Sequence, residues 1–501
     1  MSEPTMYSEP TYGNWRKPRT GGIGKLGALE TALLIGGLLV TIILFRLIGP
    51  IGGAVALAVM GGAFIFLTIR DKHGRSAGQR LLARRLFKKA SRARRNIYRS
   101  GPVGHVPDGK CRLPGLLATS ELHEFEDSFR RPFALLHMPT ANHVSVVIEV
   151  EPTGLALNDR ENIDDYVANW GAWLSGLSKT SDIVAASVTV ETAPDYGVRL
   201  RHEIDANMSE SASPAARQMM EEVKETFPQQ SAVTRAYIAL TFTTWRPGSD
   251  RNRKIEDIGL DLGTRLGKFT EHLEVCGAGD AHPVDAQTLC EVVMSAYDPV
   301  LAEHFDAARS QGVTPQVSWD NVGPVAAEAG WEWYRHASGF SKSWVMSVAP
   351  RGVVFSNVFE HLLTPSADVD RKRVTMLYRP IPAGTAMDVA ERDVNAASVR
   401  SGSTKRPSFR AAAELASAVQ TAQEVAKDAS LINFGIVITA TVMRSIDARA
   451  ASYEIEDLAG TAQLTVRPAY GSQDVAFTAG LPLGLVLPDY VAVPARVREA
   501  I

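Results

Sequence analysis

Two apolar stretches near the N-terminus, roughly Leu26 to Phe45 and Leu47 to Ile69, constrain this chain more than any other feature. Each is close to the roughly 20 residues that an α-helix needs to cross a hydrocarbon core of about 30 Å. Because the second stretch begins almost at once after the first, there is no room for the cleavage site of a signal peptide. The pattern predicts a two-helix transmembrane hairpin over residues 26–69, preceded by a cytosolic arm, residues 1–25.

Basic residues on both sides of the hairpin predict its orientation. Under the positive-inside rule they place both termini in the cytoplasm, in a multi-pass protein of the inner (plasma) membrane. Two buried helices of a globular core are the alternative, but such helices rarely run this long without a polar face. We expect the following residues at the membrane interface: Trp15, Arg16, Lys17, Arg19, Arg84, Arg85, Lys88, Lys89, Arg92, Arg94 and Arg95.

Small residues recur at four-residue spacing in the second stretch, at Ala54, Ala58 and Gly62. Such a row lets another helix approach closely. We expect its first partner to be the other arm of the hairpin, and a homo-oligomer is the alternative.

Residues 70–100 form a basic segment in which Ser76 is placed to cap a helix. Leucines supply one side and arginines and lysines the rest, which predicts a juxtamembrane helix lying on anionic lipid. DNA or an acidic partner is the alternative ligand. The formal net charge of −2 conceals a basic N-terminal fifth and a mildly acidic remainder, so we do not expect the body to bind nucleic acid directly.

Beyond residue 100 the chain alternates strands and helices. The segment Val144 to Val150 is nearly continuous in Val and Ile, and Pro139 to Asn142 precedes it as a hairpin turn. The pattern predicts a cytosolic α+β body of two units with mainly antiparallel sheets, the first with helices on one face of its sheet. The expected parts are a first domain, 101–250, a helical connection, 251–312, and a second domain, 313–501.

The motifs of catalysis and metal binding are incomplete. In Gly263 to Thr270, three residues rather than four separate the glycines of a phosphate loop, and Phe269 stands where Ser or Thr is needed. The three cysteines are too widely spaced for a zinc site. We therefore predict no enzyme activity, no catalytic residue, no cofactor and no metal. One group could ligate a metal, but because no second cluster lies at ligand spacing we interpret it as a solvated face: Glu121, His123, Glu124, Glu126 and Asp127. His137 and His143 flank a hairpin turn, where polar residues need no catalytic role.

Several segments resemble a family of actinobacterial two-pass membrane proteins encoded with the conjugation genes of integrative elements. They are Tyr12–Arg19, Tyr98–Pro102, Leu113–Leu117, Trp170–Leu174 and Val190–Asp195. More distantly, the hairpin resembles the PrgI-type subunit of type IV secretion systems. The body resembles the non-ATPase N-terminal region of the secretion ATPase, through Tyr470–Phe477 and Leu481-Pro482.

The resemblance implies a non-catalytic inner-membrane component of a type IV secretion-like conjugation apparatus. Its expected partners are the lipid bilayer, a secretion ATPase on a separate polypeptide, and other membrane subunits. Two alternatives belong to other classes: a two-pass membrane subunit of type VII secretion, and a membrane-tethered enzyme of unknown chemistry.

Overall fold

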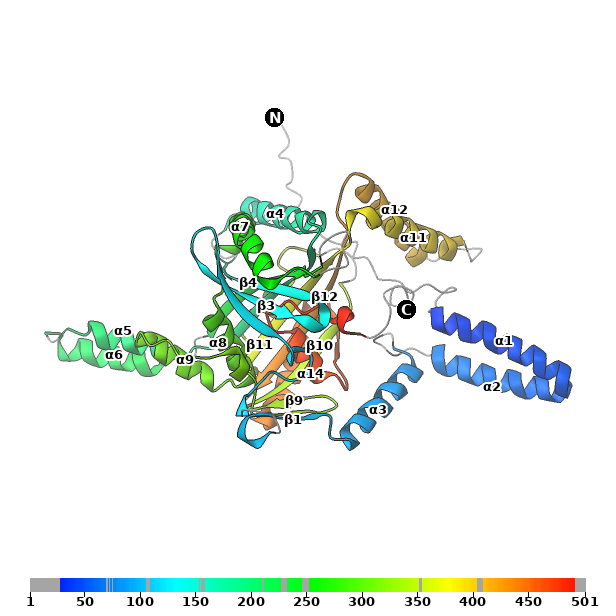
Figure 1. Ribbon diagram of the computed structural model, residues 1–501, viewed down its shortest axis with the longest axis horizontal. Helices are drawn as coiled ribbons and strands as arrows, with labels where there is room; N and C mark the ends of the chain where they lie inside the picture. The colour runs from blue at the N-terminus through cyan, green and yellow to red at the C-terminus, as the bar shows by residue number, and fades with distance from the viewer. Residues whose placement is uncertain are drawn as a thin grey trace, which may run out of the picture. The chain divides into compact units, whose positions relative to one another are not determined.

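The protein is described by a computed structural model (Figure 1) that covers residues 28–68, 71, 73, 75–104, 109–152, 154, 158–209, 211–226, 232–245, 252–350, 354–402 and 409–491. Two compact units divide these residues. The first holds the described residues of 95–382 and 434–490, and the second those of 14–94 and 383–433 together with residue 491.

The first unit is built on a sheet of 13 strands, in the order β1-β8-β9-β10-β12-β11-β5-β6-β4-β3-β2, with β13 paired to β10 and β7 paired to β4. The ladders whose register is defined are antiparallel. The strands are β1 (Ile97–Arg99), β2 (Glu121–Glu126), β3 (Pro132–Met138), β4 (His143–Glu151), β5 (Ile183–Pro194), β6 (Ala232–Thr243), β7 (Asp280–Pro283), β8 (Ala326–Ala329), β9 (Tyr334–His336), β10 (Gly339–Val348), β11 (Arg371–Pro380), β12 (Ile432–Val442) and β13 (Thr465–Pro468).

Fourteen α-helices lie in the described residues of the two units. They are α1 (Ala28–Ile48), α2 (Pro50–Thr68), α3 (Ala77–Arg92), α4 (Arg160–Lys179), α5 (Val198–Asn207), α6 (Pro214–Thr226), α7 (Ile255–Leu273), α8 (Ala286–Tyr297), α9 (Leu301–Ser310), α10 (Glu360–Leu363), α11 (Ala383–Gly402), α12 (Phe409–Ala426), α13 (Ala448–Thr461) and α14 (Gln473–Ala479). The α+β class and the antiparallel sheet are confirmed.

Both faces of the sheet are covered, which differs from the one-sided arrangement that we predicted. Alternate residues of β3 show this: Phe133 and Leu135 pack with α4 and α7, whereas Ala134 and Leu136 pack with α8 and the buried segment around Phe477. A strand buried on both faces is nearly continuous in apolar residues, because neither face meets water. The run of Val and Ile in β4 has this cause.

The sheet is also continuous across the two regions in which separate sheets were expected. Strand β11 pairs with β5, and Val374 lies opposite Val190 in their ladder. Strands from the first and the second half of the chain therefore belong to one hydrogen-bonded sheet.

The predicted transmembrane hairpin is wrong. Within the described residues, no helix has both the length and the apolar character that a bilayer crossing requires. The uncharged part of α1, residues 31–45 between Glu30 and Arg46, is shorter than the roughly 20 residues of a spanning helix. Helix α2 has 19 residues, and Gly52, Gly53, Gly61 and Gly62 interrupt its large side chains. The multi-pass membrane localisation, with both termini in the cytoplasm, depended on those two spans and is wrong for the same reason.

Candidate docking surface

Helices α1 and α2 form an antiparallel pair through Gly49, whose φ of 88° suits the tight turn and favours glycine. Their seam is close-packed. A Cβ atom at Gly37 would lie 1.8 Å from Met60 Sδ, and one at Gly53 would lie 2.7 Å from Phe45 Cδ2. The absence of side chains at these two positions lets the two helices approach closely, so the contact between them requires glycine at both positions.

The row Ala54, Ala58 and Gly62 is on the outer side of this pair. All three residues are exposed, and a Cβ atom added at Gly62 would meet no atom within 4 Å. Successive helical residues are turned by about 100°, which puts this row roughly opposite the seam residues Gly53 and Met60. We had expected this row to face α1. Instead it faces away from α1 and is open to a helix from outside the hairpin.

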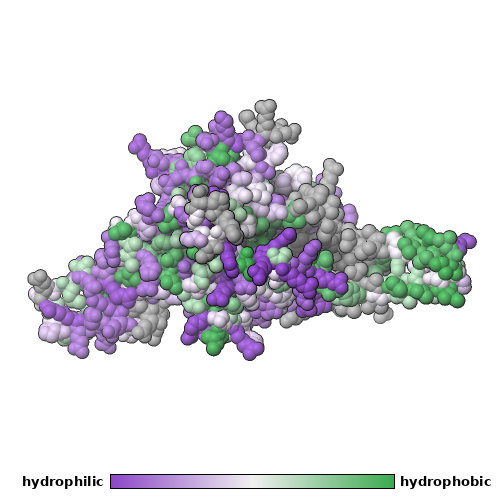
Figure 2. Space-filling model, turned by 60° about the horizontal axis from the view of Figure 1, so that its bottom comes forward, coloured by the Kyte–Doolittle hydropathy of each residue, from purple (hydrophilic) through white to green (hydrophobic). Residues whose placement is uncertain are grey.

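Large apolar side chains flank the open row. Ile51 is 80% exposed, Val55 is 59% exposed and Leu57 is 60% exposed. Figure 2 shows the surface of the hairpin as mostly hydrophobic. Exposed apolar patches of this kind mark interaction sites, because leaving them in water is unfavourable.

Helix α3, which follows α2 in the sequence, has a basic surface. Ser76 and Gln79 form a reciprocal capping box, with both hydrogen bonds at 3.2 Å, which confirms the predicted cap. Its leucines Leu82 and Leu86 are each 58% exposed, and the helix carries no acidic residue. The interface residues predicted on and just after this helix are also exposed: Arg84, Arg85, Lys88, Lys89, Arg92, Arg94 and Arg95. The predicted interface residues Trp15, Arg16, Lys17 and Arg19 lie outside the described part of the chain.

The segment that resembles a phosphate loop serves packing. Gly263 and Gly267 are buried on α7, where a Cβ atom would lie 2.6 Å from the Glu126 carbonyl oxygen and 2.6 Å from Phe129 Cε2, respectively. The Ser128 amide also donates to the Gly263 carbonyl at 3.1 Å. Glycine spacing in this segment follows from close contact between α7 and the turn after β2.

The acidic residues of β2 and of the turn that follows it make different contacts. Glu124 accepts a hydrogen bond from the Ala286 amide at 3.0 Å, at the start of α8. Asp127 accepts from the Phe129 and Arg131 amides at 2.8 Å each and closes a turn. Glu121 and His123 lie on the same face of the strand as His137 of β3.

The body holds a buried ionic network that sequence reasoning missed. Arg371 donates through Nη2 to Glu191 Oε1 at 2.7 Å and through Nη1 to the Ser295 carbonyl at 3.1 Å. The Arg373 guanidinium lies 4.8 Å from the centre of the Phe477 ring. Burial raises the pKa of Glu191, but the attraction of Arg371 and then of Arg373 outweighs it, so the pKa lies below its usual value. Alternation along β11 was the available signal, because Arg371 and Arg373 share one face of a strand.

A histidine is buried beside this network. His336 is 0% exposed, with Nδ1 2.6 Å from the Tyr297 carbonyl and Nε2 2.7 Å from Ser341 Oγ. A carbonyl only accepts, so Nδ1 carries the proton and Nε2 accepts from the Ser341 hydroxyl. Burial lowers the pKa of His336 to about 4. The imidazole is thus neutral at physiological pH and holds β9 to α8.

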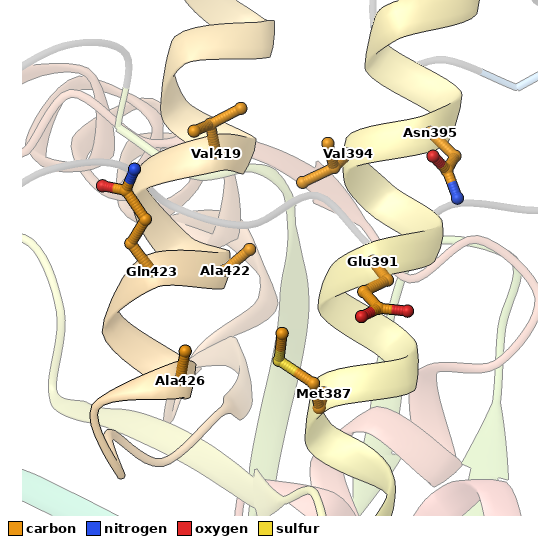
Figure 3. A pocket seen from close by; sticks show the side chains of 8 residues that line it. All are labelled: Met387, Glu391, Val394, Asn395, Val419, Ala422, Gln423 and Ala426. Carbon is orange, nitrogen blue, oxygen red and sulfur yellow. The ribbon is translucent and has the colours of Figure 1, made fainter.

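A groove of about 390 Å³ lies between α11 and α12. Its floor is apolar, and Figure 3 shows Val394 and Val419 directed toward each other across it. Glu391 is the ionisable residue of its lining, beside Asn395 and Gln423. One carboxylate among apolar side chains does not form an acid–base pair, so the groove offers a surface rather than a reaction centre.

A protein-family model matches the N-terminal part of the chain. Residues 19–79 match the model of a domain of unknown function, DUF8461. The matched segment contains α1 and α2 and reaches the first turn of α3, whereas the sheet lies outside it. No curated protein matches the chain.

Proposed function

We propose that the protein is a non-catalytic docking subunit of a type IV secretion-like conjugation apparatus, which binds the secretion ATPase or a sister subunit through the α1–α2 hairpin. The open row Ala54, Ala58 and Gly62, set among exposed large apolar side chains, is the observation that carries the proposal. Small residues at this spacing bring two helices into close contact.

The positive charge of α3 favours a protein partner that carries acidic residues next to the apolar helix with which it docks. Helix α3 exposes six basic side chains and no acidic one: Arg80, Arg84, Arg85, Lys88, Lys89 and Arg92. Opposite charge across an interface raises the association rate and rejects partners of like charge. The apolar row supplies the buried contact and α3 supplies steering.

The domain match marks the hairpin as a segment that recurs in other proteins. It covers the two helices and ends where the basic helix starts. The resemblance of the remaining segments to conjugation proteins supports the choice of apparatus. Segment 263–270, which resembled a phosphate loop, is occupied by packing against Glu126 and Phe129, which fits an assembly role.

Capture of partners from cells tests the proposal. The full chain, Ala58→Leu and Val59→Leu are each isolated from cells that carry the conjugation genes, and co-purifying proteins are identified. Leucine at position 58 fills the open row. Overpacking of a contact costs about 1–3 kcal/mol, which weakens binding by about 5-fold to 150-fold. Val59→Leu enlarges a side chain on another side of α2 and is the matched control.

We expect the wild-type chain and Val59→Leu to retain a secretion ATPase or a sister subunit, and Ala58→Leu to lose it. Retention of the same proteins by Ala58→Leu would contradict docking through the row. Binding of the wild-type chain to lipid vesicles with no secretion protein captured would contradict the proposed partner.

A further inference from the structure

We propose that Glu121, His123 and His137 form a binding site for Zn²⁺ or a similar first-row divalent cation, independent of the hairpin. One ligand atom from each residue lies within 4.8 Å of the others. Two imidazoles and a carboxylate are a ligand set that zinc takes in three-ligand sites with one open position.

Strand pairing builds the cluster. Glu121 lies directly opposite His137 in the antiparallel ladder of β2 and β3, and His123 is two residues along β2 from Glu121. Side chains two residues apart on a strand point to the same face, and opposite partners on that face are neighbours. The backbone therefore fixes all three side chains on one face before any ion binds.

The distances from the Glu121 carboxylate to the two histidine nitrogens fit tetrahedral coordination of one ion. Glu121 Oε2 lies 3.4 Å from His137 Nδ1 and 3.7 Å from His123 Nε2. With metal–ligand bonds of about 2.0–2.2 Å, neighbouring ligand atoms of a tetrahedron are about 3.4 Å apart. The ligand nitrogens of the two imidazoles lie within 4.8 Å of each other, so they must approach by up to roughly 1.4 Å to bind one ion.

One ligand atom also lacks a hydrogen-bond partner. His123 Nε2 is buried and receives no hydrogen bond, although it faces the Glu121 carboxylate. A buried polar atom without a partner is unfavourable, and a metal ion would satisfy it. The side chain of Glu121 is 61% exposed, which leaves room for water at the fourth position.

Position in the fold suggests the consequence of binding. Strand β2 is at the edge of the sheet, paired on one side to β3. An ion bound by side chains of both strands would hold the edge strand β2 to β3. Imidazole ligands favour zinc over Mg²⁺, which prefers oxygen ligands.

The test uses the full chain without an affinity tag, stripped with a chelator and titrated with Zn²⁺ by calorimetry, with Mg²⁺ titrated separately. His123→Gln and His137→Gln remove the ligands, and circular dichroism checks that each variant folds. His282→Gln is the matched control, because His282 faces Glu149 across β4 and β7 at 3.6 Å but, within the described residues, is not part of a three-ligand cluster. Co²⁺ absorption in the visible range reports tetrahedral coordination.

We expect one Zn²⁺ per wild-type chain, at least about 100-fold weaker binding in His123→Gln and His137→Gln, and unchanged binding in His282→Gln. The thermal midpoint of the wild-type chain should rise with Zn²⁺ and not with Mg²⁺. Equal Zn²⁺ binding by wild-type, His123→Gln and His137→Gln chains would overturn the site, as would no saturable binding by the wild-type chain. Loss of partner capture by Ala58→Leu tests the hairpin alone and leaves this result unaffected.

Discussion

Acid should destabilise the body through His336 before its carboxylates are protonated. The pKa of His336 is lowered to about 4 in the folded protein by burial, compared with 6.5 when it is unperturbed. As the pH falls below 6.5, the unfolded chain takes up a proton that the folded protein does not. The free energy of unfolding therefore decreases through this window and levels off near pH 4.

The size of the effect follows from the two pKa values. A shift of one unit corresponds to about 1.4 kcal/mol, so the full loss between pH 6.5 and 4 is about 3 kcal/mol, and about 2 kcal/mol is lost between pH 8 and 5. His336→Gln removes the titrating group while it keeps a donor and an acceptor for Tyr297 and Ser341. Its stability can be lower at every pH, but its dependence on pH should be flatter.

Urea unfolding followed by tryptophan fluorescence at pH 8, 7, 6 and 5 measures the effect. Trp344 is fully buried in the first unit and contributes to that signal. The difference between the wild-type and His336→Gln curves isolates this histidine from the other ten in the chain. Parallel curves between pH 6.5 and 5 would refute the assignment of a neutral buried imidazole.

Three further predictions concern packing and charge. Glu191→Gln leaves Arg371 buried without its counter-charge and should cost about 3–5 kcal/mol of unfolding free energy, measured by chemical denaturation. Because the folded pKa of Glu191 is lowered, its contribution is present above the unfolded pKa of 4.5 and is lost as pH falls through the folded value, so Glu191→Gln should show less acid loss below pH 4.5. Gly263→Ala should destabilise the first unit by about 1–3 kcal/mol, whereas Gly62→Ala should leave stability unchanged or slightly higher, and equal thermal midpoints for the two variants would contradict the packing described for α7. Gly37→Val should separate α1 from α2, seen as lower helix content and faster proteolysis, and wild-type behaviour would contradict the seam.

Local features of the fold could be predicted from the sequence. Ser76 with Gln79 signals a helix start because both partners of a capping box lie within one turn. The Val and Ile run of β4 signals a buried strand. In both cases the interactions that decide the structure are short-range in sequence.

Features that depend on distant residues could not be predicted. Arg371 and Arg373 begin β11 as buried residues only because Glu191 is brought opposite by pairing with β5. His137 joins Glu121 and His123 only through the register of β2 and β3. Hydropathy alone predicted two membrane spans. The charges within α1 shorten its uncharged part, and the glycines of α2 interrupt its large apolar side chains.

Photo-crosslinking in cells measures the proposed docking most directly. A photoreactive amino acid replaces Ala58 on the open row, or Met60 in the seam with α1, in the full chain. Docking of a partner helix predicts an adduct containing a secretion ATPase or a sister subunit from position 58 and none from position 60. No protein adduct from position 58, or the same adduct from both positions, would contradict it.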